Sequence, residues 1–242
     1  MMSTLESVWE GSRPRVVVCR GAYRRGWLMR IVTTVVVLCL FMAAAGCADA
    51  VGGRPAAVRP AATVQDSVVT IEEASLVLGS ALSTTDTAGE PAQAFVTAPP
   101  SCAAAAGPGT TAAYRPGWTV FWSTVYGDGH GDHTVTQTIG TFADAAQAAT
   151  VFRTVRDGVR GCPTAVRTDD DGSTSQWAYR PGTVTPTAFD WTAAQDAGDG
   201  WTCYRQVRVQ ARSVLQVAVC GVGDLQHAVV ALADRFVERV SG

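Results

Sequence analysis

Four of the seven cysteines in this 242-residue chain constrain it more than any other feature: Cys102, Cys162, Cys203 and Cys220. The other three lie in, before or directly after the predicted export signal described below. The four cysteines lack the CxxC spacing of zinc-thiolate sites, which disfavours a metal centre. An even set of cysteines in an exported domain predicts two disulfides, and four cysteines allow three different pairings. The pairing and the export of the chain are therefore the first two questions that the sequence must answer.

Local structure helps to choose the pairing. Residues 203–210 and 213–220 both have the composition of strands. A hairpin centred between Ala211 and Arg212 places Cys203 directly opposite Cys220, where cross-strand neighbours lie within reach of a disulfide. A four-residue loop with the same centre keeps this pairing. We therefore expect Cys203–Cys220, which leaves Cys102–Cys162 as the second disulfide.

The amino terminus has the pattern of a signal peptide. Residues 31–45 form an uncharged run of about fifteen residues, shorter than the ~20 that a membrane-spanning helix needs. Arginines precede this run and small residues follow it, which is the order of a cleaved export signal. We predict a signal peptide over residues 1–46. Met29 directly precedes Arg30 and the apolar run, so residues 1–28 are interpreted as an over-extended start.

The run ends in Ala44-Ala45-Gly46-Cys47, which resembles the lipobox of bacterial lipoproteins. The resemblance implies that Cys47 is fatty-acylated and becomes the first residue of the mature protein, anchored at the extracytoplasmic face of the cell membrane. The usual Leu of the first lipobox position is replaced by Ala44, and the alternative is an ordinary cleaved signal. Residues 47–66 are rich in Ala, Gly, Pro and Val and are expected to form a linker.

Charge excludes one class of partner. Residues 47–242 carry 13 Arg and 19 acidic residues, a net charge of −6. A nucleic-acid-binding domain needs a basic surface, so no nucleic-acid partner is expected. Hydrophobic residues make up 47% of the chain, which is enough to build a folded core.

The remaining patterns predict an α+β fold, with a twisted antiparallel sheet flanked by helices, over residues 67–242. A capping box predicts a helix from Thr70 to about Leu78, ended by Gly79. An apolar stripe predicts a helix over 142–159 with Thr141 as its N-cap, and another stripe predicts a helix over 225–240. Strands are expected at 118–126, 133–140, 175–180 and 184–190, in addition to the cysteine hairpin, and 83–117 is expected to be rich in loops.

One resemblance adds to this interpretation. An aromatic hairpin is followed by an amphipathic helix that leads into a cysteine, and then by a hairpin that begins Trp201-Thr202-Cys203 and ends Val219-Cys220-Gly221. Over residues 67–241 this order resembles the PknH-like extracellular sensor domain of mycobacteria and other actinobacteria, found on receptor kinases and in stand-alone lipoproteins. The resemblance implies the same disulfide order and a cleft for an unidentified ligand. This chain has no kinase domain, which puts a signalling role in doubt.

The candidate ligand-binding residues come from two strands. Trp118 and Trp122 are expected to share one strand face with Val120, Thr124 and Tyr126, either as core or as a stacking wall for a ligand. Tyr204, Gln206 and Arg208 alternate onto one face of the cysteine hairpin, either as solvent-exposed surface or as the floor of a cleft. Arg208 is the candidate for holding a carboxylate or phosphate.

Metal binding and catalysis find little support. The segment Asp128-Gly129-His130-Gly131-Asp132-His133 and the run Asp169-Asp170-Asp171 have metal-binding residue types, but both are expected to be solvated turns. The chain has neither a G-x-S-x-G elbow nor a glycine-rich phosphate loop. We expect no cofactor, no metal and no enzymatic activity.

Three functional hypotheses follow. The first is a membrane-anchored, non-enzymatic module of the cell envelope that binds a cell-wall or small extracellular ligand, as a sensor-type domain does. The second is a structural or accessory lipoprotein that binds an envelope protein. The third is a hydrolase whose active site is assembled from residues distant in sequence, for which His130, His133 and His227 are the candidates.

Overall fold

The computed structural model describes residues 64–115 and 117–241. The predicted signal peptide, Cys47 and most of the predicted linker lie outside the described residues. In chain order the elements are α3 (Ile71–Leu78), β1 (Leu82–Ala88), β2 (Val96–Ala98), the 3-10 helix η1 (Pro100–Cys102), α4 (Ala103–Ala106), β3 (Trp118–Asp128), β4 (His133–Phe142), α5 (Ala145–Arg160), β5 (Thr164–Thr168), β6 (Thr174–Val184), β7 (Ala188–Gln195), β8 (Trp201–Gln210), β9 (Ser213–Val222) and α6 (Gln226–Ser241).

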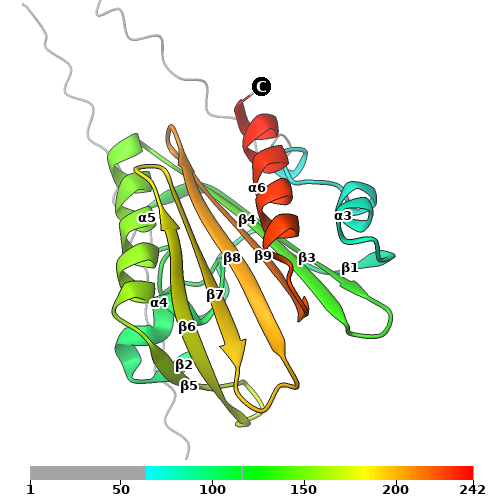
Figure 1. Cartoon of the computed structure of the whole chain (residues 1–242). Helices are drawn as coiled ribbons and strands as arrows, with labels where there is room; N and C mark the ends of the chain where they lie inside the picture. Colours follow the sequence, from blue (N-terminus) through cyan, green and yellow to red (C-terminus); the bar gives the residue numbers. More distant parts are fainter. Residues whose placement is uncertain (1–63, 116, 242) are drawn as a thin grey trace, which may run out of the picture. The chain divides into compact units, whose positions relative to one another are not determined.

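A single nine-stranded antiparallel sheet organises these elements, in the order β1-β3-β4-β9-β8-β7-β6-β5-β2. The early hairpin β3–β4 joins the late hairpin β8–β9 through the pairing of β4 with β9, two interior strands of the sheet (Figure 1). The predicted fold class, a twisted antiparallel sheet flanked by helices, is confirmed.

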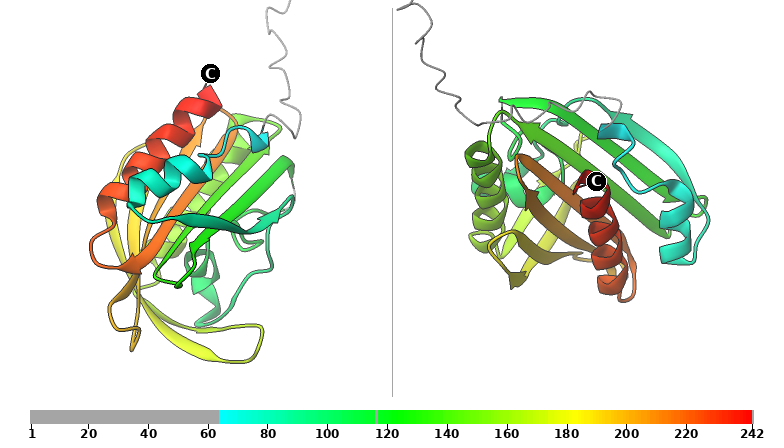
Figure 2. Two further views of the ribbon diagram at one scale, coloured as in Figure 1. Left: turned by 90° about the vertical axis from the view of Figure 1, so that its right-hand side faces the viewer. Right: turned by 90° about the horizontal axis from the view of Figure 1, so that it is seen from above.

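Helices cover the two faces of the sheet unequally. On one face α5 packs against β4, β6, β8 and β9, with η1 and α4 beside it. On the other face α6 packs on β8 and β9, and α3 lies between α6 and β1 (Figure 2). Each face has its own core. The α5 core includes Phe121, Phe152 and Trp191, and the α6 core includes Ile139, Leu232 and Phe236. No helix among the described residues is long and apolar enough to span a bilayer.

Both predicted disulfides are present. The β8–β9 hairpin pairs Gln210 with Ser213 across a two-residue turn, and this register sets Cys203 opposite Cys220 with their Cα atoms 3.9 Å apart. Cys102 and Cys162 join the end of η1 to the loop after α5, with a Cα–Cα distance of 5.4 Å. The Cys203–Cys220 disulfide links neighbouring strands, whereas Cys102–Cys162 ties two distant segments together on the α5 side of the sheet.

The helix starts illustrate where the predicted patterns succeed and fail. The capping box of α3 is present, with Thr70 and Glu73 hydrogen-bonded to each other's backbone N–H, and Gly79 ends the helix in the left-handed conformation. For α5 the expected N-cap was wrong. β4 continues through Thr141, whose hydroxyl hydrogen-bonds Ser213, and α5 begins at Ala145 with Asp144 as its cap.

Three strands were not predicted. β1 and β2 lie within the segment expected to be loop, and β5 begins two residues after Cys162. In addition, the strand expected at 184–190 is displaced, because β6 continues to Val184 and β7 begins at Ala188. The missed strands β1, β2 and β5 lie at the two sides of the sheet, where short strands leave little periodic signal.

The segment before α3 is fastened to the sheet. Buried Gln137 on β4 accepts a hydrogen bond from the Val69 N–H at 2.8 Å, and its side-chain amide donates to the Val69 carbonyl at 2.9 Å. The hydroxyl of Tyr126 donates to the same carbonyl at 3.1 Å. Arg239, near the end of α6, donates to the Val68 carbonyl at 3.0 Å. The two ends of the described domain are thus bound to each other.

Candidate functional site: the open face of the sheet

One part of the sheet has no helical cover. Among the described residues, α6 packs on β8 and β9, and no helix packs on the same side of β5, β6 and β7, which Figure 1 shows towards the viewer. Side chains alternate along these strands, so Trp177, Trp191 and Ala193 point into the α5 core while their neighbours point outward. We call five of the outward residues the open face: Val166, Gln176, Ala178, Thr192 and Ala194.

These five residues have small or amide side chains, and the charged side chains of Arg180 and Asp190 lie beside them on the same side of β6 and β7. Val166 is 38% exposed, and Thr192, Ala178 and Ala194 are half-buried. An open hollow of about 310 Å³ lies between β6 and β7, lined by Gln176, Trp177, Ala178, Ala194, Gln195 and Asp196. A surface of this composition offers methyl groups for apolar contact and an amide and a hydroxyl for hydrogen bonds.

Three predicted ligand-binding residues lie along the border between the open face and α6. Tyr204 pairs across the strands with Thr192, Gln206 with Asp190 and Arg208 with Ala188. Their polar groups have partners within the protein. The Tyr204 hydroxyl donates to the Gly223 carbonyl at 3.1 Å.

Arg208 is held in an internal network. Its Nε donates to Gln206 at 2.9 Å, and an Nη lies 2.6 Å from a carboxylate oxygen of Asp234 on α6. The guanidinium therefore fastens α6 to the sheet, and an external carboxylate or phosphate would compete with Asp234 for it. In the present geometry the three residues form a wall of the open face.

The two predicted tryptophans do not join this site. The expectation that Trp118 shares a strand face with Trp122 is wrong, because a bulge between Trp118 and Val120 turns the start of β3 over. Trp118 consequently packs in the α5 core, where its ring lies 6.1 Å from that of Phe121. Trp122 packs against the α6 core. The structure therefore separates these two side chains by the thickness of the sheet.

The segments with metal-binding residue types form turns. His133 contacts Asp128 at 2.9 Å across the β3–β4 turn. Desolvation raises the pKa of Asp128, but hydrogen bonds from His133 and from backbone N–H groups of the turn outweigh it and lower the pKa to about 2. Asp171 accepts a hydrogen bond from the Ser173 N–H at 2.9 Å. Across residues 64–115 and 117–241 no group of three or more His, Cys, Asp or Glu side chains is placed to hold a metal ion.

Sequence reasoning missed the residues of the open face. Val166 belongs to a strand that was not predicted, and Thr192 and Ala194 lie in the displaced strand β7. The alternation of buried and half-buried residues in β7 gives a signal in retrospect. This alternation identifies an uncovered sheet face only when the position of α6 over β8 and β9 is known.

Comparison with known proteins identifies the family. A family model described as the PknH-like extracellular domain matches residues 59–239. The chain belongs to this family. The PknH-like domain thus spans nearly all of the described residues, and the resemblance inferred from the cysteine pattern is confirmed.

A solved structure has the same PknH-like fold. The crystal structure of the extracellular domain of PknH from Mycobacterium tuberculosis matches with a TM-score of 0.70 and 20% sequence identity, over 76% of this chain and 97% of that chain. At this identity the likeness establishes the fold. No curated protein matches the chain in a sequence search.

Proposed function

We propose that this protein is a lipid-anchored, extracytoplasmic binding module of the cell envelope, without catalytic activity. Three observations support the proposal. Residues 31–47 have the pattern of an export signal that ends in a lipobox. The domain belongs to a family described as extracellular. Its four cysteines form two disulfides, which persist in oxidising compartments.

The open face is the proposed binding site, and the single observation that carries this is a helix-free stretch of sheet beside α6, with small and polar side chains at its centre and Arg180 and Asp190 at its border. Thr192 and Gln176 offer a hydroxyl and an amide, and Ala178, Ala194 and Val166 offer apolar contact. This combination suits an uncharged, hydroxyl-rich ligand such as a cell-wall glycan, which needs many weak hydrogen bonds and little charge.

Titration with neutral cell-wall oligosaccharides, followed by amide chemical shifts, tests this site. Ala178→Arg and Ala194→Arg place a long charged side chain on the open face and are expected to weaken binding at least tenfold. Ala146→Arg on the exposed side of α5 is the matched control and is expected to bind like the wild type. Shift changes confined to residues outside β5–β8, or equal binding by all variants, would contradict the assignment.

A protein partner is the second candidate, favoured by two exposed valines, one on the open face and one beside it. Val96 on β2 is 70% exposed and Val166 on the adjacent β5 is 38% exposed. Crosslinking in native membranes separates the candidates. A single protein crosslinked from positions 96 and 166, with no glycan binding by the purified domain, would replace the ligand-binding proposal.

The anchor is tested separately. Mass spectrometry of the protein from native membranes is expected to find an acylated amino terminus at Cys47. Cys47→Ser is expected to abolish acylation and to release the protein from the membrane fraction. An unmodified amino terminus at any other residue would exclude the lipoprotein assignment while leaving the binding proposal intact.

A further inference from the structure

The interior beneath α4 is unusually polar. Five buried side-chain atoms of the described residues have no hydrogen-bond partner, on Thr110, Arg167, Tyr179, Trp191 and Arg205. All five residues lie on the α5 side of the sheet or in the segment that covers it. Buried polar groups normally have partners, so this concentration of unpaired groups requires an explanation.

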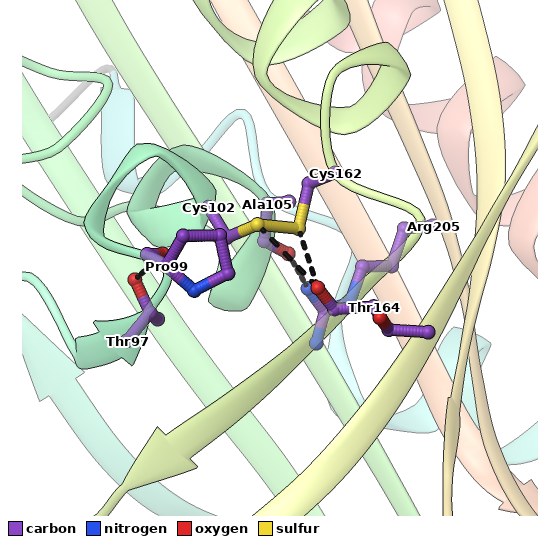
Figure 3. Close-up of a disulfide and its surroundings, with 7 residues drawn as sticks. All are labelled: Thr97, Pro99, Cys102, Ala105, Cys162, Thr164 and Arg205. Carbon is purple, nitrogen blue, oxygen red and sulfur yellow. Dashed lines mark hydrogen bonds between the residues drawn. A yellow bond between two sulfur atoms is a disulfide. The ribbon is translucent and has the colours of Figure 1, made fainter.

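Arg205 is the centre of this group. It lies on β8, is 4% exposed and points to the α5 side of the sheet. Its terminal nitrogens donate to the carbonyls of Ala105 at 2.8 Å and Ala106 at 3.3 Å, at the end of α4. Figure 3 shows its side chain beneath the Cys102–Cys162 disulfide, with the Ala105 carbonyl above it. The Nε–H of Arg205 has no acceptor.

The charge of Arg205 is also uncompensated. None of the ion pairs formed by the described residues includes Arg205. Burial lowers the pKa of Arg205 to about 10, with Tyr179 acting in the opposite direction and the cation Arg167 adding a smaller lowering. A buried guanidinium is costly unless an opposite charge accompanies it, and the two α4 carbonyls supply only partial charge.

Two further unpaired donors lie on the strands beside Arg205. Trp191 is the direct cross-strand neighbour of Arg205, and Tyr179 pairs with Ala193, two residues along β7. Both residues are 3% exposed, and the Trp191 indole N–H and the Tyr179 hydroxyl are unpaired. Guanidinium and indole groups can donate hydrogen bonds but cannot accept them. The Tyr179 hydroxyl can accept, but it bonds to neither of them, so both donors lack an acceptor.

We propose that the polar interior beneath α4 is a binding site for a small anion, held by the Nε–H of Arg205, the indole N–H of Trp191 and the hydroxyl of Tyr179. The ligand must be small, because the Trp191 ring is packed at 5.3 Å against Phe189 and the segment from η1 to α4 closes the site. A halide ion and the carboxylate of a short organic acid share the required chemistry. This site lies across the sheet from the open face and does not depend on it.

Thermal unfolding in different sodium salts at matched ionic strength tests the proposal. Chloride, formate and acetate are compared with gluconate, which is too bulky for the site. A ligand that binds the folded state alone raises the melting temperature with its concentration. We expect at least one small anion to raise the melting temperature of the wild type in a saturable manner. Chloride would indicate an inorganic anion, and formate or acetate alone would indicate the carboxylate of an organic acid.

Variants separate site binding from general salt effects. Trp191→Phe and Tyr179→Phe each remove one unpaired donor and are expected to weaken the apparent affinity at least threefold. Arg205→Met is expected to abolish the anion dependence. If this variant does not fold, the two Phe variants still test the proposal. Trp177→Phe is the matched control, because its indole N–H already donates to Ser175 at 2.8 Å. Equal salt dependence in all variants, or none in the wild type, would show that water satisfies these donors and would overturn the proposal.

Discussion

Replacing Gln137 by Leu is expected to detach the amino-terminal segment from the sheet. Gln137 and Val69 are both 0% exposed, and two hydrogen bonds of 2.8 and 2.9 Å join them. In Gln137→Leu the side-chain volume is retained, but the Val69 N–H is left buried without an acceptor. The Val69 carbonyl keeps one donor, the hydroxyl of Tyr126.

The magnitude follows from these contacts. An unsatisfied buried N–H costs about 1–3 kcal/mol and the second lost hydrogen bond about 1 kcal/mol, so Gln137→Leu is expected to lower the free energy of unfolding by about 2–4 kcal/mol. Tyr126→Phe leaves both Gln137 bonds in place and is expected to cost about 1 kcal/mol. The order of the two variants is therefore itself a prediction.

Urea denaturation measures the loss of stability, and hydrogen exchange locates it. The Val69 amide is expected to exchange at least about 30-fold faster in Gln137→Leu, the factor that corresponds to about 2 kcal/mol. Amides at the centre of β8 should change only by the global loss of stability. A loss below about 0.5 kcal/mol, or unchanged protection at Val69, would refute the claim that this side chain fastens the segment.

Three other predictions follow from the structure. The Cys102–Cys162 disulfide has a sequence separation of 60 and Cys203–Cys220 has one of 17. Loop entropy therefore predicts that replacing each pair with Ala lowers the free energy of unfolding by about 4.3 and about 3.1 kcal/mol, respectively, measured by urea denaturation. A larger loss for Cys203–Cys220 than for Cys102–Cys162 would contradict this model. The pKa of Asp128 falls on folding to about 2, so its stabilising effect is present above pH ~4 and is lost as the pH falls towards 2; the difference in melting temperature between wild type and Asp128→Asn should shrink over that range, and a constant difference would argue against it. Thr70→Ala breaks the capping box of α3 and should cost about 1 kcal/mol, while Thr70→Ser should be nearly neutral in the same assay.

Periodicity was a good guide where an element is long and one of its faces is buried. The hairpins β3–β4 and β8–β9 and the helices α5 and α6 were predicted because their patterns extend over about ten residues or more. The register of the β8–β9 hairpin predicted Cys203–Cys220, and Cys102–Cys162 followed as the remaining pair. The α3 capping box was predicted because its four residues hold all of the relevant contacts. In these cases local sequence and tertiary structure agree.

The errors have tertiary causes. Thr141 has the residue type of an N-cap, but the pairing of β4 with β9 extends to Thr141 opposite Ser213 and delays the helix to Ala145. The bulge after Trp118 has no sequence signature, and it moves that side chain across the sheet. Arg205 alternates with Tyr204 and Gln206 along one strand, and its burial becomes evident once η1 and α4 are placed over it.

The open face and the polar interior beneath α4 could not be predicted for a related reason. Both depend on which part of a nine-stranded sheet each helix covers. Helices of eight residues or fewer, such as α3 and α4, carry little information about the surface they pack on. Only the assembled sheet distinguishes a covered strand from an uncovered one.

β4 pairs with β9, a strand that comes much later in the chain, and this pairing has a consequence for the order in which the domain can fold. A polypeptide that crosses a membrane amino terminus first delivers β3, β4 and α5 long before their partner strand arrives. During that interval the Cys102 and Cys162 thiols can already meet, whereas Cys220 is still to emerge. The sheet is complete when the last strand, β9, pairs with β4. Until translocation ends, the strands already delivered therefore keep an apolar face uncovered.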